Sequence, residues 1–549
     1  MLLILLLLVA GFLLGGLGER RLANPDEGRY AEIAREMAAS GDFVTPRLNG
    51  LNYFEMPPLQ DWATAVSFKL FGENEFAARL YTALCALGSV MLMFFVGARL
   101  FDERTGLLAA AVLIAAPYFA AMAGVVTLDM GLTFWMTLAV AAFLVAQHAP
   151  HVADSRRWMW VSAAGMAGAV LSKGLIGVVF PAAVVFLYGV LHRDVSLLKR
   201  IPWVSGLVVF FALVSPWFIW VSIENPEFAR FFFIHEHVER FTTTTHRRVA
   251  PAWYFLPILL AGLLPWALVL FPAALCAWSR PGHIVASDGA YTSTTFKPLR
   301  FVLIFTAFIF AFFSASGSKL PAYILPFFPV LALVIAVYLR DVPAKRLAWL
   351  TGPMLAAALA GAYAISRALV TREAVAFSGP LHGQMGQWLY IATAVLAVGA
   401  AAGFVLLLKS QKWVGIATIA SATVIAVGLI QIGYEKISPL QSGYAVAQVI
   451  KAKSTPATRL YSIKIWDQSA AFYLGRTLTL VEYVDEFALG QQQEPAKSMA
   501  SLKDFSTAWS APGAVIAIIA PGDGEALRAL GLQFEIIHQD PRRVAIRKL

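Results

Sequence analysis

Charged residues are scarce in this sequence of 549 residues, since Asp, Glu, Lys and Arg together make up 14%. Soluble globular proteins carry about 25%. Hydrophobic residues make up 59%, and the mean hydropathy is +0.69. Apolar runs of about 18 or more residues recur along most of the chain. This combination excludes an ordinary soluble protein and predicts a polytopic α-helical membrane protein.

Cysteine is almost absent. The two cysteines, Cys85 and Cys276, both lie inside apolar segments, which excludes a disulfide framework and a CxxC metal site. Acidic residues are outnumbered, and the formal net charge is +10. In a soluble chain this excess would indicate nucleic acid binding. Here Lys and Arg gather in short loops on one side of the apolar runs, so membrane topology explains the charge and no nucleic acid partner is expected.

The apolar runs define a membrane topology. Loops such as "RLFDERTG", "LHRDVSLLKR" and "LRDVPAKR" each carry two or more basic residues, which places this set of loops in the cytoplasm. The first run has no basic region before it and no clear cleavage site after it, so we interpret it as a retained span. The thirteen expected spans are 1–18, 78–100, 106–125, 128–147, 158–174, 176–192, 203–222, 253–278, 299–315, 322–339, 347–365, 387–408 and 414–433.

A change of composition after Tyr434 predicts a second domain. The runs "RLYSIKIWDQSAAFYLG", "TLTLVEYV", "GAVIAIIA" and "QFEIIHQDPRRVAIRKL" are of β type, and "DGEALRALG" is typical of a helix. We expect a transmembrane domain over 1–433 and a small soluble α/β domain over 434–549. An odd number of spans places the α/β domain on the outer side, together with the long loop 19–77. In a Gram-negative inner membrane this side is the periplasm.

The loop 19–77 is too long for a simple connector. We expect Asn24 to cap a helix whose first position is Pro25, with Glu27 in the place of a capping-box acid. A second helix is expected at "LQDWATAVSFKLFG". Both would lie along the membrane surface.

One face of the first loop helix is apolar. Tyr30, Ile33 and Met37 form a stripe at helical spacing with Asp26 at its top, while Arg29, Glu32, Arg35 and Glu36 occupy the other faces. Asp26 would then point toward the protein or the bilayer, which makes it a candidate catalytic residue. The alternative is a carboxylate placed favourably in the helix dipole.

Three further outer positions carry candidate residues. Asp129 begins the fourth expected span and is either a cap or a second catalytic carboxylate that faces the same cavity as Asp26. In "SASGSKLPAYILP", Lys319 and Tyr323 accompany small residues that allow backbone to approach a ligand, which favours phosphate binding. Lys173, at another outer turn, could likewise bind phosphate. The alternative for both lysines is a plain turn with a snorkelling side chain.

A metal site is a further hypothesis. Glu55, His235 and His237 could together bind a divalent metal such as zinc. The alternative is that the histidines bond to loop backbone. Arg240 belongs to a basic cluster on the outer side, which is either a solvated face or a site for an acidic lipid.

The motifs "PDEGRYAEIAREM", "NYFEMPPLQDW", "SKLPAYILP" and "FYLGRTLTLVEYVDEF" together resemble the aminoarabinose transferase (ArnT) family, which belongs to the GT-C glycosyltransferases that include protein O-mannosyltransferases. The resemblance covers essentially the whole chain. It implies transfer of 4-amino-4-deoxy-L-arabinose from undecaprenyl phosphate to a lipid A phosphate, with resistance to polymyxin as the outcome. It further implies a monomer in the inner membrane that needs no cofactor.

The resemblance also assigns residues. Asp26 matches the acidic residue of the first loop, and Tyr53, Glu55 and Met56 lie in the motif that holds the carrier phosphate and sugar. The family usually reads Glu-Lys-Pro where this chain has Glu55, Met56 and Pro57. Because Met56 cannot hold a phosphate, either Lys319 and neighbouring arginines suffice, or the chain is impaired, or the methionine is an engineered substitution.

The chemistry fits these residues. An acceptor phosphate is already anionic and hardly needs a general base, and a polyprenyl phosphate leaves as a stable anion, so catalysis rests on orientation and on cations. Other hypotheses are a GT-C enzyme with a different sugar or a protein acceptor, a lipid or sugar transporter, and a sensor whose tail binds a partner. Transporters usually place charges near the bilayer midplane within repeats, and neither feature is visible here.

Overall fold

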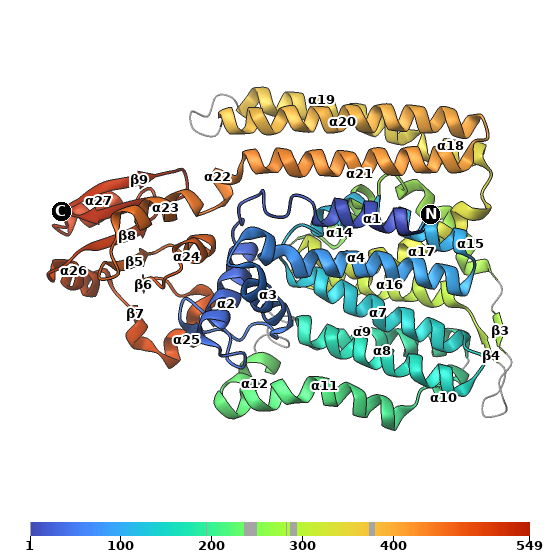
Figure 1. The fold of residues 1–549 in the computed structure, drawn as a ribbon, viewed down its shortest axis with the longest axis horizontal. Coiled ribbons are helices and arrows are strands. Elements are labelled where there is room, and N and C mark those ends of the chain that lie inside the picture. Colours follow the sequence, from blue (N-terminus) through green and yellow to red (C-terminus); the bar gives the residue numbers. More distant parts are fainter. Residues whose placement is uncertain (1, 194, 235–249, 281–282, 286–293, 373–378) are drawn as a thin grey trace. The chain divides into compact units, whose positions relative to one another are not determined.

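The computed structural model describes residues 2–193, 195–234, 250–280, 283–285, 294–372 and 379–549. Figure 1 gives the order of the elements along the chain. The chain divides into two compact units. The first consists of Met1–Gly15, Thr82–Arg367 and Gln387–Gln431, and the second of Gly16–Tyr81, Ala368–Gly386 and Ile432–Leu549.

Helices make up most of the first unit. The helices are α1 (Leu2–Leu14), α4 (Glu75–Leu100), α5 (Glu103–Ile114), α6 (Pro117–Met122), α7 (Leu128–His148), α8 (Val152–Lys173), α9 (Ile176–His192), α10 (Ser196–Lys199), α11 (Trp203–Glu224), α12 (Phe228–Arg230), η2 (Ala252–Tyr254), α14 (Phe255–Gly262), α15 (Ala267–Ser279), α16 (Pro298–Ala315), η3 (Pro321–Phe327), α17 (Phe328–Asp341), α18 (Ala344–Thr351), α19 (Pro353–Arg372), α20 (Gly379–Leu408) and α21 (Lys412–Lys436). A short hairpin joins β3 (His283–Val285) to β4 (Thr294–Phe296).

The protein is a multi-pass membrane protein, and a helix occupies each of the thirteen expected apolar segments. Among the described residues, eight helices are long and apolar enough to cross a membrane, or nine if the pair Ala252–Gly262 and Ala267–Ser279 counts as one span. That pair is bent by 103°. The expected span 106–125 is divided between α5 and α6 just before Pro117, where the missing N–H and the ring interrupt the helix. A count of thirteen spans therefore remains a prediction.

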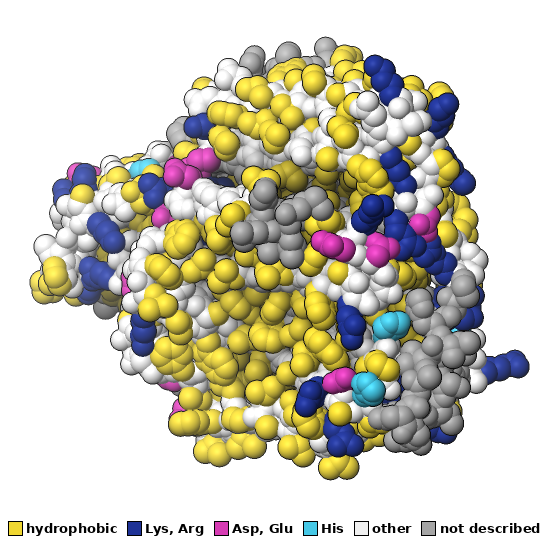
Figure 2. Space-filling model, turned by 45° about the vertical axis from the view of Figure 1, so that its right-hand side comes forward, with side chains coloured by type: hydrophobic (Ala, Val, Ile, Leu, Met, Phe, Trp, Pro, Cys, Tyr) yellow, Lys and Arg dark blue, Asp and Glu magenta, His cyan; other side chains and the backbone are white. Residues whose placement is uncertain are grey.

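Small residues bring α7 and α8 together. A Cβ added at Gly165 would lie 2.7 Å from the backbone nitrogen of Ala139, and one at Gly168 would lie 2.3 Å from the Trp135 ring. The Ser162 hydroxyl donates a hydrogen bond to the Ala139 carbonyl at 2.8 Å. Such close approach is typical of helices that pack inside a membrane. On the face drawn in Figure 2, charged side chains gather along one margin of a broad hydrophobic surface.

The second unit contains a mixed six-stranded sheet with the order β7-β6-β5-β8-β10-β9. The pairings β7-β6, β6-β5 and β5-β8 are parallel, whereas β8-β10 and β10-β9 are antiparallel. The strands are β5 (Arg459–Ile463), β6 (Thr479–Val481), β7 (Ser498–Met499), β8 (Val515–Ile519), β9 (Phe534–Gln539) and β10 (Val544–Lys548). The helices between them include α23 (Tyr444–Lys453), α24 (Gln468–Leu474), α25 (Ala488–Gln493), α26 (Leu502–Ser510) and α27 (Gly524–Ala529), with η4 (Asp485–Phe487) and η5 (Pro495–Lys497). The expected α/β fold of the tail, including the helix at α27, is confirmed.

One part of the tail differs from the prediction. Within "RLYSIKIWDQSAAFYLG", only Arg459–Ile463 is a strand, and Gln468–Leu474 forms α24. Asp467 caps this helix by accepting a hydrogen bond from the Ala470 N–H at 2.8 Å. The apolar run gives no indication of this change, because a cap acts at a single position.

The two expected loop helices are present in the second unit as α2 (Asp26–Ser40) and α3 (Leu59–Phe71). The expected cap is wrong, because Pro25 occupies the cap position and no side chain caps α2. The Asn24 side chain instead accepts a hydrogen bond from the Ser469 N–H of α24 at 2.8 Å. Helices α2 and α24 touch at Gly28, where an added Cβ would lie 2.4 Å from the Ser469 nitrogen.

Burial of α2 extends beyond its apolar stripe. Tyr30, Ile33 and Met37 are buried as expected, but Glu32 and Arg35 are buried too, with exposures of 0% and 8%. Their side chains form an ion pair at 2.7 Å. These charged residues lie on the other faces of the helix, and those faces are covered as well. Packing against α3 and α24 covers the helix on several sides, so its residues pair with each other instead of with water.

The crowding of acids on α2 predicts a pH-dependent stability. Burial, reinforced by the neighbouring Glu32 carboxylate, raises the pKa of Glu36 from 4.5 to about 8. Since the folded state holds this proton more tightly than the unfolded state, the stabilisation is complete below pH 4.5 and is lost as the pH rises through 8. From this one group, the free energy of unfolding falls by at most about 1.4 kcal/mol for each unit of pH.

The measurement is the melting temperature of the purified protein between about pH 5 and 9. We expect Glu36→Gln to melt with a shallower dependence on pH than the parent protein. Glu525→Gln, which changes an exposed acid of α27, should keep the parent slope. Identical slopes for Glu36→Gln and the parent protein would contradict the assignment.

Candidate functional site

Charged groups at the start of α2 surround Arg29 in the second unit. The Arg29 guanidinium lies 3.4 Å from the Asp26 carboxylate and 2.5 Å from the Glu486 carboxylate of η4. The contact with Glu486 is an ion pair, although its angle is not that of a hydrogen bond. Gln468 of α24 donates to the second oxygen of Glu486 at 2.9 Å. The side chain of Asp26 remains 44% exposed, whereas the sequence predicted that it points away from water. Asp26 is therefore open to a ligand.

The loop between β2 (Leu51–Asn52) and α3 lies in the same unit and carries the residues of the "YFEMPPL" motif. Tyr53 is buried, and its hydroxyl donates a hydrogen bond to the Glu55 carboxylate at 3.0 Å. Burial and the Glu55 charge raise the pKa of Tyr53 well above its ordinary value, so Tyr53 acts as a neutral donor. Met56 is half-buried beside Glu55 and presents no cation. The loop thus offers one acid held by a tyrosine.

Glu27 does not belong to this open group. Its carboxylate is 2% exposed and accepts hydrogen bonds from Arg20 at 2.7 and 2.9 Å and from Arg79 at 2.8 and 3.0 Å. It also accepts one from the Ala23 N–H at 2.9 Å. Burial opposes ionisation, but the two guanidinium groups hold the pKa of Glu27 well below its ordinary value. The role of Glu27 is to fix the chain before α2.

A second group of candidates lies in the first unit. Asp129, at the start of α7, forms an ion pair with Lys173 at the end of α8. Both side chains are largely buried, with exposures of 9% and 12%. The Lys173 ammonium lies 4.9 Å from the centre of the Tyr323 ring of η3. The structure therefore brings together three of the residues that the sequence singled out, and it neutralises Lys173 within the group.

Lys319 differs from Lys173 because no described carboxylate pairs with it. Its side chain is 7% exposed, and its ammonium donates a hydrogen bond to the Ser316 carbonyl at 2.5 Å. It belongs to the same turn as Tyr323, which begins after α16. A buried ammonium is costly without a counter-charge. Lys319 is thus a buried cation whose charge no described carboxylate compensates.

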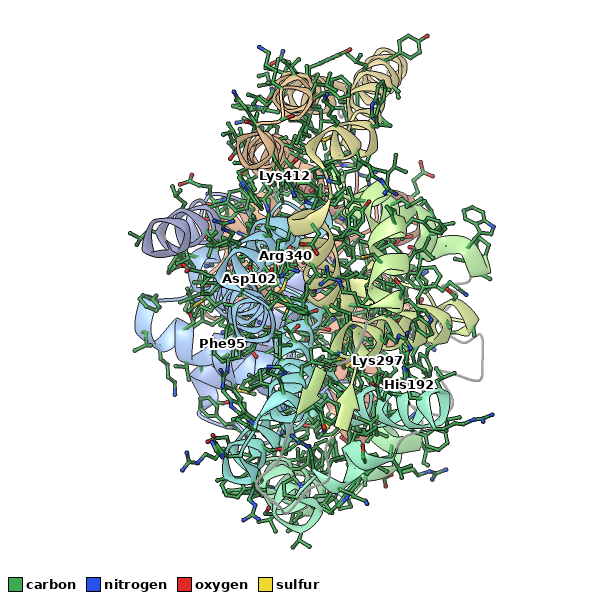
Figure 3. All side chains as sticks on the ribbon, turned by 90° about the vertical axis from the view of Figure 1, so that its right-hand side faces the viewer. Phe95, Asp102, His192, Lys297, Arg340 and Lys412 are labelled. Carbon is green, nitrogen blue, oxygen red and sulfur yellow. The ribbon has the colours of Figure 1, made fainter. Side chains whose placement is uncertain are left out.

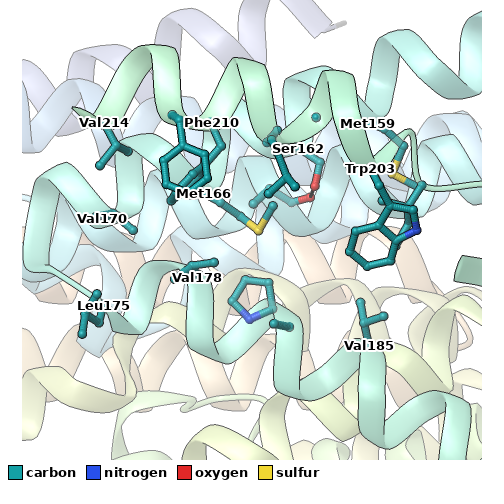
Figure 4. A pocket seen from close by; sticks show the side chains of 18 of the residues that line it. Met159, Ser162, Met166, Val170, Leu175, Val178, Val185, Trp203, Phe210 and Val214 are labelled. Carbon is teal, nitrogen blue, oxygen red and sulfur yellow. Dashed lines mark hydrogen bonds between the residues drawn. The ribbon is translucent and has the colours of Figure 1, made fainter. Parts of the chain in front are cut away.

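The first unit also encloses a large apolar cavity of about 1070 Å³ between α7, α8, α9 and α11. Figure 4 shows side chains such as Met166, Val178 and Phe210 facing into it. Ser162 adds one of its few polar groups, and that hydroxyl is already bonded to the Ala139 carbonyl. Such a lining suits a hydrocarbon chain and no charged ligand.

Some predicted residues cannot be placed. His235, His237 and Arg240 lie outside the described residues. Within the described part of the chain, no group of three or more His, Cys, Asp or Glu side chains is arranged to hold a metal. The proposed zinc ligation by Glu55 and the histidines remains a prediction.

The sequence analysis did not identify Arg29 and Glu486 as members of the charged group around Asp26. Arg29 follows Asp26 by three residues on one helix, which is a recognisable signal for a pair. Glu486 lies in the quoted motif "VEYVDEF", but its partner is 457 positions away and no spacing rule reaches it.

Two family models match the chain. The model described as dolichyl-phosphate-mannose-protein mannosyltransferase matches residues 1–232, and the model described as aminoarabinose transferase C-terminal domain matches residues 446–548. The second match covers the six-stranded sheet and its helices.

Individual relatives agree with the family models. An undecaprenyl phosphate-α-4-amino-4-deoxy-L-arabinose arabinosyl transferase of Shewanella sediminis is 34% identical over 58% of this chain, and the chain spans 56% of that relative's length. The protein of the same name from Aeromonas hydrophila is 31% identical over 73% of this chain and 72% of its own length. A crystal structure of ArnT from Cupriavidus metallidurans bound to undecaprenyl phosphate matches with a TM-score of 0.92 at 33% identity, over 100% of this chain and 98% of that one.

Proposed function

Because the chain belongs to the aminoarabinose transferase (ArnT) family, we propose that it transfers 4-amino-4-deoxy-L-arabinose from undecaprenyl phosphate to a phosphate group of lipid A. The names of its relatives supply the donor, and the structure of the Cupriavidus protein holds undecaprenyl phosphate. The observation in this chain that carries the proposal is Lys319, a buried ammonium that no described carboxylate neutralises. A departing polyprenyl phosphate is an anion that this cation would stabilise.

The reaction is a substitution at the anomeric carbon of the sugar. An oxygen of the acceptor phosphate forms the new bond to that carbon, and the bond from the carbon to the carrier phosphate oxygen breaks with its electron pair. The acceptor oxygen is already ionised at neutral pH, so no base has to remove a proton. The protein is left to orient both lipids and to stabilise the charge that develops on each side of the breaking bond.

The group around Asp26 suits a positively charged ligand, and the group around Lys319 suits a negatively charged one. We assign Asp26 to the positive charge that develops on the sugar ring or to the sugar's ammonium group, because it is the more exposed acid of its group. Tyr53 and Glu55 would bind sugar hydroxyls beside it. In the first unit, Asp129 positions Lys173, which lies against the Tyr323 ring. Lys319 would hold the carrier phosphate. The apolar cavity of that unit would take part of the polyprenyl chain.

The deciding experiment uses the purified full-length protein. The protein is incubated with lipid A and aminoarabinosyl undecaprenyl phosphate, and the mass of the lipid product is measured by mass spectrometry. We expect lipid A with one added aminoarabinose and release of undecaprenyl phosphate. Unmodified lipid A would overturn the assignment, and sugar on a protein acceptor supplied in its place would identify a related GT-C activity instead.

The location belongs to the same proposal. A lipid A acceptor places the enzyme in the inner membrane of a Gram-negative cell, where we expect a monomer with its α/β tail in the periplasm. Alternating basic loops support this orientation. A reporter that works only in the cytoplasm should stay inactive when fused after Leu549, and an active reporter would refute the topology.

Met56 gives a direct test of the phosphate contacts. The family usually has lysine here, and a charge-assisted hydrogen bond to phosphate is worth about 1.5–3 kcal/mol. We therefore expect Met56→Lys to raise affinity for undecaprenyl phosphate about tenfold or more. Carrier binding and sugar transfer are measured for Met56→Lys, for the parent protein and for Met56→Gln, which has a similar length and no charge. Equal binding by all three would show that the loop of Met56 does not touch the carrier phosphate.

A further inference from the structure

Several basic loops of the first unit converge at the ends of their helices. The end of α4, the end of α15, the start of α16 and the end of α17 enclose a pocket of about 430 Å³. Arg280, Lys297, Arg300 and Arg340 line it, together with apolar side chains that include Leu100 and Leu299. Figure 3 looks onto these helix ends, where Lys412, Arg340 and Asp102 form a group and Lys297 lies beside His192.

This pocket is distinct from the Lys319 group. Helix α16 has 18 residues, which corresponds to about 27 Å. Lys297 and Arg300 lie at the first end of that helix, and Lys319 follows its last turn. The length is that of a membrane hydrocarbon core, so the pocket and Lys319 lie at opposite membrane faces.

Nearby acids compensate only part of the positive charge. Arg340 forms ion pairs with Asp102 at 2.5 Å and with Asp341 at 2.8 Å, and Arg280 also pairs with Asp341. These two carboxylates are thus shared by two of the four cations that line the pocket. Lys412 adds a further ammonium, which donates to the Arg340 carbonyl at 2.7 Å.

The other two cations have no described carboxylate partner. The Arg300 guanidinium donates a hydrogen bond to the Trp278 carbonyl and lies 5.3 Å from the centre of the Trp278 indole ring. It also approaches His192 Nε2 at 3.4 Å. The backbone N–H of Lys297 donates to the Tyr188 hydroxyl at 2.8 Å, while its ammonium forms no ion pair with a described carboxylate. Neither cation therefore has to leave a described carboxylate in order to bind an anion.

The neighbourhood indicates a lipid rather than a soluble anion. Trp278 is 45% exposed beside Arg300, and tryptophan at the end of a membrane helix marks the level of the lipid headgroups. Apolar side chains share the lining with the four cations, which suits a molecule that joins a phosphate to a hydrocarbon chain. Basic pockets between helix ends are known to hold anionic headgroups.

We propose that the pocket of Arg280, Lys297, Arg300 and Arg340 binds the headgroup phosphate of an anionic membrane phospholipid, with Lys297 and Arg300 supplying the uncompensated charge. The site does not depend on the proposed sugar transfer, because it lies at the other membrane face. Binding would hold the ends of α15, α16 and α17 together and raise the stability of the first unit.

The experiment uses the full-length protein in an uncharged detergent, freed of co-purified lipid. Phosphatidylglycerol is the probe, and phosphatidylcholine and inorganic phosphate are the comparison ligands. Native mass spectrometry counts bound lipid, and the melting temperature reports its effect. We expect one saturable phosphatidylglycerol and a higher melting temperature, with neither effect from phosphatidylcholine or inorganic phosphate.

The variant Lys297→Gln/Arg300→Gln should bind phosphatidylglycerol at least tenfold more weakly. Its matched control is Lys345→Gln/Arg346→Gln, which removes the same charge from exposed positions of α18 and should bind as the parent protein does. Because Arg300 also contacts Trp278, the single variants Lys297→Gln and Lys345→Gln repeat the comparison without disturbing that contact. Equal binding by variant and control overturns the proposal. So does displacement of the lipid by millimolar inorganic phosphate, which would identify a site for soluble anions.

Discussion

Replacing Arg79 by methionine is expected to lower the melting temperature by about 6–20 °C. Arg79 is 1% exposed and binds Glu27 through two nitrogens. It also donates to the carbonyl oxygens of Leu17, Arg20 and Arg21 at 2.7, 2.5 and 3.1 Å. Methionine fills much of the space but leaves a buried carboxylate undercompensated and three carbonyls without their donor. Breaking a buried pair in this way costs about 3–5 kcal/mol.

The control for this prediction is Lys451→Met, which removes a cation from an exposed position of α23 and should change stability by less than about 0.5 kcal/mol. The double variant Glu27→Gln/Arg79→Met separates charge pairing from packing. Since it removes both partners of one interaction, it should lose less stability than the sum of the single variants. Strict additivity, or a melting temperature of Arg79→Met equal to that of Lys451→Met, would show that the network contributes little.

Asp26→Asn is expected to reduce sugar transfer by about a hundredfold to a thousandfold while the protein stays folded. A carboxylate about 4 Å from a positive charge, at an effective dielectric constant of about 20, contributes about 4 kcal/mol. That charge develops on the sugar only as the bond to the carrier breaks, so the loss should appear in turnover. Folding should survive because Asp26 is 44% exposed and its contact with Arg29 is a long 3.4 Å.

Turnover, carrier affinity and melting temperature are measured for Asp26→Asn and for Glu525→Gln, an isosteric change at an exposed acid of α27. The control should match the parent protein in all three. Near-normal turnover in Asp26→Asn would reduce Asp26 to a residue that interacts with the helix dipole. A fall in melting temperature as large as the fall in activity would instead assign it a structural role.

Periodicity predicted the elements that local sequence determines. The stripe of Tyr30, Ile33 and Met37 identified α2 and its buried face, and long apolar runs located the membrane helices. Periodicity did not predict where a run is interrupted, as before Pro117 or within the pair bent by 103°. Periodicity also missed α24. The run that contains this helix was assigned as β type, and the change from strand to helix depends on Asp467, which caps the helix.

The candidate groups were predictable only in part. Asp26, Asp129 and Lys319 stand out because a charge beside an apolar run is unusual. Lys173 stands out too, but its pairing with Asp129 does not, since the two lie 44 positions apart and the contact depends on how α7 and α8 pack. The buried pair of Glu32 and Arg35 resembled an exposed face. A sequence pattern shows which residues are charged but not which charges the fold covers.

The second unit joins chain segments that are made at very different times. Asn49 exchanges two hydrogen bonds of 2.7 Å with the backbone of Leu478, and the Leu22 N–H donates to the Tyr473 hydroxyl at 2.8 Å. Ribosomes add about 5–20 residues per second, so the early loop waits about 20 to 90 seconds for the tail to be made. During that interval α2 carries its buried acids without their final neighbours. Translation of the intervening membrane helices therefore sets how long this loop waits before it can complete its fold.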